Sequence, residues 1–397
     1  MKRTSDFKGE RLVQAREARK MTATNLADVL GVSLSTVSAY EHERQKPPMD
    51  IVEKLSIILN VPQQFFYYKI PELNIKGLFF RSMSSATKSA RVRGMRRYEW
   101  MQEIVVYLKE FFDFPILNIP EFDVPLEFNR IDCSHIEEAA RALRKLWDVK
   151  TGPCPNLVRL SESKGILISR WKLDAPGLDA FSQWSKGGRP FVVLGSDKAA
   201  AVRSRFDLAH EIGHLVLHRH VNESSVSSAR DNKIIEQQAN RFASAFLLPA
   251  KEFATDLYAP TLDAFRMLKQ KWKSSIGAMI VRSLDLNIID EEQSRRLWIN
   301  MNRRGWRTHE PLDDAIEIEY PSLISQCIKM MVNEKFKTKE QILNDLSLSE
   351  NDIEELCGLE RGYFSEMPVR VLPQIRYSLQ KDPREEDGGD IIPFRSV

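Results

Sequence analysis

The sequence predicts an α+β protein that is mostly α-helical. Apolar residues recur at helical spacing within residues 1–70, 136–148 and 203–247, and again over 260–380. Between these segments, residues 165–195 change to short β-rich runs bounded by Gly and Pro. At 397 residues the chain is long for one hydrophobic core and suits two to four domains.

Composition excludes several classes of protein. A hydrophobic content of 43% with 28% charged residues describes an ordinary globular chain. The net charge is only +3, so any nucleic-acid binding must come from local charge distribution. The four cysteines form no C-x-x-C pair and indicate reduced thiols rather than a disulfide framework. We find no apolar leader and no run of 18 apolar residues, so we expect a cytoplasmic protein with no membrane partner.

Shifts in pattern divide the chain into five segments. We expect a compact helical domain over 1–70, a basic linker and helix over 71–125, and an α+β domain over 126–260. A helical C-terminal region should follow over 261–380, and the charged residues 381–397 read as a disordered tail.

Residues 1–70 have the spacing of a helix-turn-helix. Thr22 can cap a helix over Ala23–Leu30 that ends at Gly31, and Ser33 can cap the next helix, from Leu34 to about His42. The second of these helices would enter the major groove of double-stranded operator DNA. Its candidate DNA-contacting residues are Ser33, Ser35, Thr36, Ser38 and Ala39.

The core-facing side of this helix would carry Val37 and Tyr40. None of the DNA-facing side chains makes a strong bidentate base contact, so sequence discrimination by this helix alone should be modest. Heads of this kind commonly act as dimers on two half-sites, so a homodimer is possible. The alternative is a helical domain used for protein contact.

The segment from Met21 to Glu41 resembles the XRE (Cro-type) helix-turn-helix family. Two positions depart from the family pattern. Ala23 replaces a common Gln, which removes a phosphate contact, and Glu43 replaces a common Gly, which adds negative charge near the DNA side. Both departures bear on DNA affinity and leave the fold intact.

Two further segments have open interpretations. Residues 73–98 carry seven basic residues and no acidic one, which fits either phosphate contacts or docking against the α+β domain. Residues 337–358 read as two short helices around a turn, with Ser349 as a cap. Their acidic residues disfavour DNA contact and favour a packing or partner-binding module.

Residues 165–195 predict a small antiparallel sheet. Its strands would come from the runs at 165–169, 178–184 and 190–195.

The most informative motif is His210-Glu211-Ile212-Gly213-His214. On a helix, the two histidines lie one turn apart on the same face and can bind one metal ion. Glu211 lies about 100° around the helix from His210, near the ion, where it can take a proton from water. The alternative is that both histidines are ordinary core or surface residues.

A catalytic zinc usually has three protein ligands, so a third is needed. His218 is about 12 Å along the helix axis from His210, too far to share an ion. Glu223 lies in a stretch rich in Ser and Asn with no rigid support. Glu236 is our choice, because nearby Ala239 and Ala243 permit close packing against the histidine helix. His218 and His220 are expected to support the ligands, face substrate or lie exposed.

Arg205–His218, followed by Glu236–Ala243 and Phe246–Pro249, resembles the ImmA/IrrE family of bacterial metallopeptidases. The resemblance covers roughly residues 130–260, and more loosely 272–311. It implies a zincin-like domain with Zn²⁺ held by His210, His214 and Glu236, and Glu211 as general base. It also implies a protein substrate of the repressor or antitoxin kind, whose cleavage switches genes on.

These features predict a DNA-binding transcriptional regulator with zinc endopeptidase activity. The alternative is a non-proteolytic regulator that uses the peptidase fold as a sensor or partner-binding module. Self-cleavage of the chain is a third possibility, although no scissile bond is marked.

Overall fold

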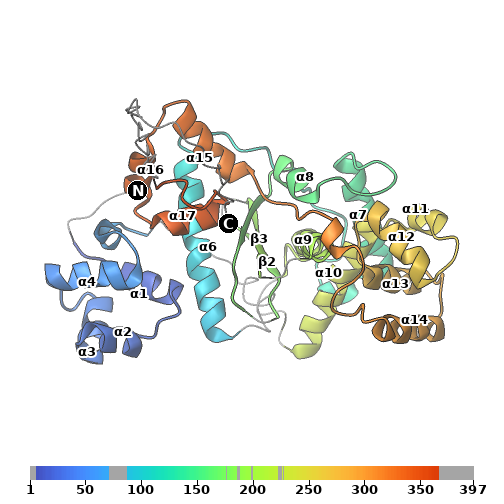
Figure 1. Cartoon of the computed structure of the whole chain (residues 1–397), viewed down its shortest axis with the longest axis horizontal. Helices are drawn as coiled ribbons and strands as arrows, with labels where there is room; N and C mark the ends of the chain where they lie inside the picture. Colours follow the sequence, from blue (N-terminus) through green and yellow to red (C-terminus); the bar gives the residue numbers. More distant parts are fainter. Residues whose placement is uncertain are drawn as a thin grey trace, which may run out of the picture.

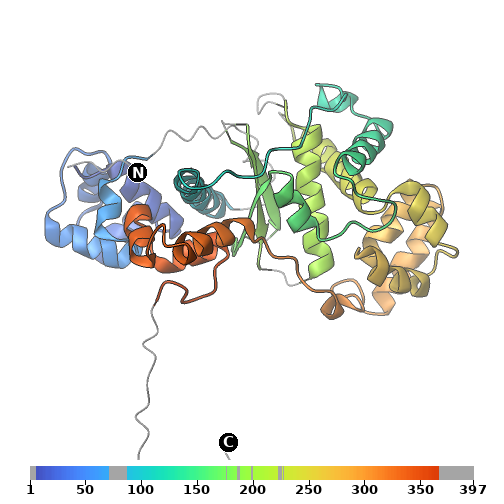
Figure 2. The same cartoon turned by 90° about the horizontal axis from the view of Figure 1, so that it is seen from above.

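The computed structural model describes residues 6–70, 87–175, 177–185, 188–197, 200–221, 226 and 228–365. A small sheet lies near the middle of the elongated chain, with helices on both of its faces (Figures 1 and 2). Two hydrophobic cores meet on this sheet, one on each face. The α+β, mostly helical fold class predicted from the sequence is therefore confirmed.

The N-terminal head contains α1 (Gly9–Ala18), α2 (Ala23–Leu30), α3 (Leu34–Glu41), α4 (Met49–Leu59) and the 3₁₀ helix η1 (Gln63–Tyr67). The side chains of Thr22 and Ser33 accept hydrogen bonds from the first turns of α2 and α3, as the sequence predicted. Gly31 ends α2 in the left-handed conformation, at φ 69°. Helices α2 and α3 thus form the predicted helix-turn-helix.

The sheet has strands β1 (Leu167–Trp171), β2 (Ala180–Trp184) and β3 (Pro190–Gly195) in the order β1-β3-β2. β2 and β3 form an antiparallel hairpin, but β1 pairs with β3 in parallel. The prediction of an antiparallel sheet is therefore wrong for the β1–β3 pair. Strand β2 runs antiparallel to β1 but does not pair with it, because the apolar strand β3 lies between the two.

Each strand contributes side chains to both cores. Leu167 and Trp171 of β1 join the core on the head side, whereas Ile168 joins the core on the opposite face. Because both faces are covered, every residue of β1 is buried. The same burial on both faces explains why β3 is a continuous apolar run rather than an alternating one.

The core on the head side combines segments far apart in the chain. The long helix α6 (Lys88–Leu108) lies in the segment 71–125, where the sequence predicts a basic linker and a helix, and it packs with the head and with one face of the sheet. The C-terminal helices α15 (Leu323–Asn333), α16 (Lys339–Leu346) and α17 (Glu350–Cys357) complete this core. Ser349 caps α17 as predicted, and the α16–α17 module packs within the chain.

The second core lies on the other face of the sheet, at the right of Figure 1. Its helices begin with η2 (Phe128–Arg130), α7 (Cys133–Leu146), α8 (Leu157–Ser163), α9 (Ala201–Leu217) and α10 (Ala229–Leu247). They continue with α11 (Ala250–Asp256), α12 (Leu262–Trp272), α13 (Ile276–Asp285), α14 (Glu291–Arg303) and the 3₁₀ helix η4 (Asp313–Ala315). Helix α9, which carries the histidine motif, packs against β2, β3 and α10.

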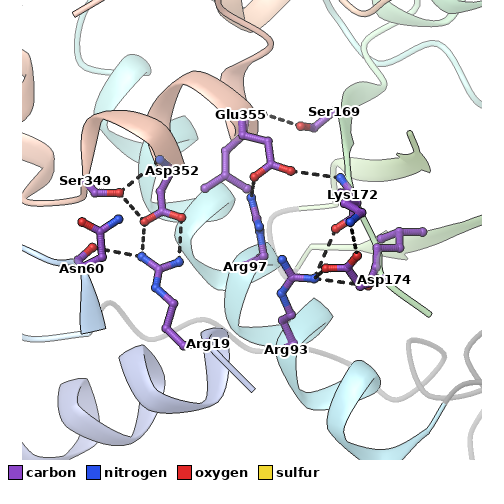
Figure 3. A network of polar contacts seen from close by, with 12 residues as sticks. Arg19, Asn60, Arg93, Arg97, Ser169, Lys172, Asp174, Ser349, Asp352 and Glu355 are labelled. Carbon is purple, nitrogen blue, oxygen red and sulfur yellow. Dashed lines mark hydrogen bonds and ion pairs between the residues drawn. The ribbon is translucent and has the colours of Figure 1, made fainter. Parts of the chain in front are cut away.

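A network of ion pairs and hydrogen bonds connects the head, α6, α17 and β1 (Figure 3). Arg19 of the head binds Asp352, and Arg97 of α6 binds Glu355 at 2.6 Å. The Ser169 hydroxyl on β1 donates to the Leu356 carbonyl of α17. The C-terminal helix α17 is thereby bonded to the head, to α6 and to the sheet.

Within the described residues, no helix is both long enough and apolar enough to cross a lipid bilayer.

Candidate metal centre and nucleic-acid interface

Helix α9 places the two motif histidines on one face. His210 and His214 lie one turn apart, and their ring centroids are 4.6 Å from each other. The opposite face of α9 holds Leu208, Ile212 and Leu215 in the core, which fixes the rotation of the helix. The two histidines therefore face α10, where Asn240 and Glu236 contact them.

Small residues bring α10 close to α9. Ala239 and Ala243 are fully buried where the two helices meet. On α9, a Cβ added to Gly213 would lie 3.1 Å from Phe242 Cδ1 and 3.2 Å from the Ala239 carbonyl oxygen. This close approach places the Glu236 carboxylate beside both imidazoles.

The three side chains converge on one point. His210 Nε2 lies 3.0 Å from His214 Nε2, and the Glu236 carboxylate lies 3.2 Å from the first and 3.6 Å from the second. All three ligand atoms fall within 4.8 Å of one another. Tetrahedral zinc with bonds of about 2.0–2.1 Å sets ligand atoms roughly 3.3 Å apart, so the set fits such an ion.

Glu211 lies beside this set and is almost completely buried. Its Oε2 atom has no hydrogen-bond partner in the described structure. A buried carboxylate oxygen without a partner is costly unless water or a cation satisfies it. This orphan oxygen is a second observation that fits a metal ion and a water molecule at this position.

Other side chains hold the histidines. His210 Nδ1 is 2.9 Å from Asn240 Oδ1, and His214 Nδ1 is 3.0 Å from His218 Nδ1. His218 is fully buried, and its Nε2 lies 3.0 Å from Gln238 Oε1. His218 is therefore a supporting residue, one of the roles the sequence left open for it. The sequence reasoning did not identify Asn240 or Gln238.

Of the other two candidates, only His220 lies among the described residues. His220 is exposed and lies 3.4 Å from the Glu121 carboxylate. Glu223, considered as a third ligand, falls outside the described residues.

Electrostatic coupling within the set is strong. Burial alone would lower the pKa of His210, but the hydrogen bond to Glu236 and nearby carboxylates raise it. Burial alone would raise the pKa of Glu236, but the two imidazoles lower it. Burial, reinforced by His214, lowers the pKa of His218 to about 3. His218 is thus a neutral imidazole at physiological pH.

A cavity of about 900 Å³ reaches the neighbourhood of His210, although none of the three candidate ligands lines it. Asn240, which bonds to His210, is part of its wall. Much of the remaining wall is apolar and includes Phe206, Ile234, Trp298 and Met301. The metal-ligand set therefore lies beside a space large enough for a peptide segment or a small molecule.

The predicted DNA-facing residues lie on the surface of the head. Ser33 and Ser35 are exposed and Thr36, Ser38 and Ala39 are partly exposed, whereas Val37 and Tyr40 are buried as predicted. In Figure 1, α3 lies on the side of the head away from α15–α17. Helix α3 is thus open to a ligand as large as a DNA duplex.

Glu43 has a structural role that the sequence reasoning missed. Its backbone is left-handed, at φ 55°, which explains why Gly is common at this position in similar heads. Its Oε1 accepts a hydrogen bond from the Gly9 amide at the start of α1, and its carboxylate lies 3.7 Å from Lys8. The negative charge is thus partly compensated at a helix N-terminus.

Three arginines of the basic stretch make internal contacts. On α6, Arg93 pairs with Asp174, Arg96 pairs with Glu17, and Arg97 pairs with Glu355. These contacts support the docking interpretation for this part of the stretch. Lys76 and Arg81 lie outside the described residues.

Comparison with protein families agrees with the description of the metal site and with that of the N-terminal head. Residues 161–284 match the IrrE N-terminal-like domain of the M78 peptidases, and residues 12–65 match a helix-turn-helix family. The chain therefore joins an XRE-type helix-turn-helix domain to an ImmA/IrrE metallopeptidase-family domain. No curated protein matches the chain.

Proposed function

We propose that the chain is a DNA-binding transcriptional regulator with zinc-dependent endopeptidase activity. Its substrate would be a partner protein of the repressor or antitoxin kind. The observation that carries the proposal is the convergence of His210, His214 and Glu236 at spacings that fit tetrahedral zinc. The match of residues 161–284 to a peptidase family supports it.

Within this proposal, His210, His214 and Glu236 hold the ion. When bound, Zn²⁺ supplies Lewis-acid chemistry that acidifies water and polarises a peptide carbonyl. Glu211 acts as general base, because its buried Oε2 has no other partner and can accept a proton from the attacking water. The same carboxyl then delivers this proton to the leaving amine.

The cavity beside Asn240 is our candidate for the substrate segment next to the scissile bond. Its apolar wall would take an apolar side chain of the substrate. The head, over residues 1–70, would place the peptidase domain, over residues 126–260, at an operator. A homodimer would bind two half-sites through two copies of α3.

Glu211→Gln in the full chain tests the peptidase. We expect the variant to keep its zinc and to lose about 10²–10⁴-fold in cleavage rate, because the amide cannot accept the proton. Candidate substrates are DNA-binding proteins encoded beside this gene, incubated with the purified zinc-loaded protein. The matched control is the exposed Glu340→Gln on α16, which should cleave like wild type. Undiminished cleavage by Glu211→Gln would exclude Glu211 as the base.

The alternative is a non-proteolytic regulator, and the large cavity favours it because such a space can also bind a sensed ligand or partner. In that case, a zinc-loaded protein would cleave none of the neighbouring DNA-binding proteins, while DNA binding would persist. The DNA function has its own test. Affinity for the chain's own promoter should fall steeply with salt, whereas a flat response would indicate that the head contacts protein instead.

A further inference from the structure

A chain of hydrogen bonds runs from His214 into the protein interior. His214 Nδ1 contacts His218 Nδ1 at 3.0 Å, and His218 Nε2 contacts Gln238 Oε1 at 3.0 Å. Gln238 Nε2 in turn donates to the carbonyls of Phe128 and Ile131, at 2.7 and 2.9 Å. Every member lies on or beside α9, α10 and η2.

The two backbone carbonyls at the interior end of this hydrogen-bond chain determine which atom is the donor in each contact. The carbonyl oxygens of Phe128 and Ile131 only accept, so the Gln238 atom facing them must be the NH₂ group. The amide oxygen of Gln238 therefore faces His218, and it can only accept. His218 must then carry a hydrogen on Nε2.

The tautomer of His218 in turn determines which nitrogen of His214 carries the hydrogen. His218 is completely buried, and no carboxylate is paired with it in the described structure, so the ring is neutral and its Nδ1 has a lone pair. His214 Nδ1 must therefore be the donor in the contact between the two rings. A neutral His214 that carries its hydrogen on Nδ1 presents the lone pair of Nε2 toward Glu236, 3.6 Å away.

We propose that His218 and Gln238 are positioning residues that lock His214 in the tautomer required of a metal ligand. This inference rests on the proposed zinc site, but it concerns how the protein prepares that site. Asn240 orients His210 directly, because its Oδ1 lies 2.9 Å from His210 Nδ1. Partners of this kind typically change metal affinity about 10–100-fold.

His218→Phe tests the proposal, because phenylalanine keeps a buried ring and removes the acceptor for His214 Nδ1. We expect zinc affinity, measured in the full chain by competition with a chromophoric chelator, to fall about 10–100-fold. His220→Phe is the matched control, because this nearby histidine is exposed and does not contact the ligand set. His218→Gln, which restores an acceptor, should recover part of the affinity.

A second measurement needs neither zinc nor activity. In metal-free full-length protein labelled with ¹⁵N-histidine, His214 should appear as the Nδ1–H tautomer and His218 as the Nε2–H tautomer. In His218→Phe, His214 should lose this single form and populate both neutral tautomers. Thermal unfolding of the metal-free variants establishes that they are folded.

The outcomes separate the two proposals. If wild type binds no zinc but shows the predicted tautomers, the proposed enzyme fails and the hydrogen-bond chain stands. If wild type binds zinc and His218→Phe keeps affinity within twofold, the positioning role is overturned. An Nε2–H tautomer at His214 in the metal-free wild type would also overturn it.

Discussion

The contact between Arg19 and Asp352 allows the role of the C-terminal helices to be tested. Arg19 donates two hydrogen bonds to the Asp352 carboxylate, at 2.9 and 2.5 Å, and joins residues 333 positions apart (Figure 3). We predict that Arg19→Met loosens α17 from the head. The substitution keeps an apolar stem of similar length, so packing against Trp100 is largely retained.

The expected magnitude follows from burial. Removing one partner of a fully buried ion pair costs about 3–5 kcal/mol, whereas an exposed pair contributes about 0–1 kcal/mol. Here Asp352 is 6% exposed and Arg19 is 20% exposed, so the pair is close to the buried limit. Asp352 keeps one donor in the variant, the hydroxyl of Ser349 at 2.6 Å. We therefore expect a loss of about 2–3 kcal/mol.

Native-state hydrogen exchange is the suitable assay. The free energy of opening is read from the buried amides of α17, among them Ile353 and Leu356, without assuming that the whole chain unfolds in one step. Asp352→Asn and the double variant complete a cycle, in which the second substitution should add little to the first. Lys46→Met removes an ion pair that lies on the surface and should leave α17 unchanged. An opening free energy within about 0.5 kcal/mol of wild type in Arg19→Met would refute the reasoning.

Three further predictions concern the helices around the candidate metal site and the binding of zinc there. Gly213→Val should push α10 away from α9, because even a Cβ at this position would lie 3.1 Å from Phe242. Thermal unfolding should show a loss of about 1–3 kcal/mol in the free energy of unfolding, and zinc binding should be weaker. Arg282→Met should destabilise the protein by about 1–3 kcal/mol in denaturant, because it removes two hydrogen bonds, of 2.6 and 2.8 Å, to Glu137. Burial alone would raise the pKa of Glu137, but Arg282 holds this pKa below its ordinary value of 4.5. The stabilisation by this pair is therefore fully present above pH 4.5 and is lost as the pH falls through the pKa of Glu137 in the folded protein. The loss of stability at low pH should be smaller in Arg282→Met. Finally, zinc at one hundred times its Kd should stabilise wild type by about 2.7 kcal/mol, and a chelator should reverse the rise in Tm, whereas His210→Ala should respond to neither.

The convergence of His210, His214 and Glu236 could be predicted because it depends on local geometry. The spacing of His210 and His214 places both on one face of any helix, and the small residues after Glu236 indicated where a second helix comes close. The same i, i+4 spacing relates His214 to His218, and that signal was used only to reject His218 as a ligand. Its contact with His214 through Nδ1 follows from the same geometry.

Contacts between residues far apart in sequence were harder to predict. The antiparallel β2–β3 hairpin is local in sequence, but the parallel β1–β3 pair joins strands that are separated in sequence by the whole of β2, and no motif marks that pairing. Asn240 and Gln238 reach their partners only because of the rotation and the close approach of α10. The acidic residues Asp352 and Glu355 of α17 pair with Arg19 of the head and Arg97 of α6, and these partners lie too far away in sequence to be predicted.

The position of the head relative to the metal site follows from buried contacts rather than from the linker. Arg11 of α1 forms two hydrogen bonds, of 2.8 and 2.9 Å, with Glu103 of α6, and both side chains are almost fully buried. Burial raises the pKa of Glu103 despite this arginine, so the carboxylate needs the head to remain charged. Helix α6 packs on one face of the sheet, and on the other face the Ser182 hydroxyl donates to the Glu211 carbonyl at 3.4 Å. A head that moved freely would leave Glu103 buried without its partner, so the structure favours one body in which α3 and the His210 site keep a fixed relation.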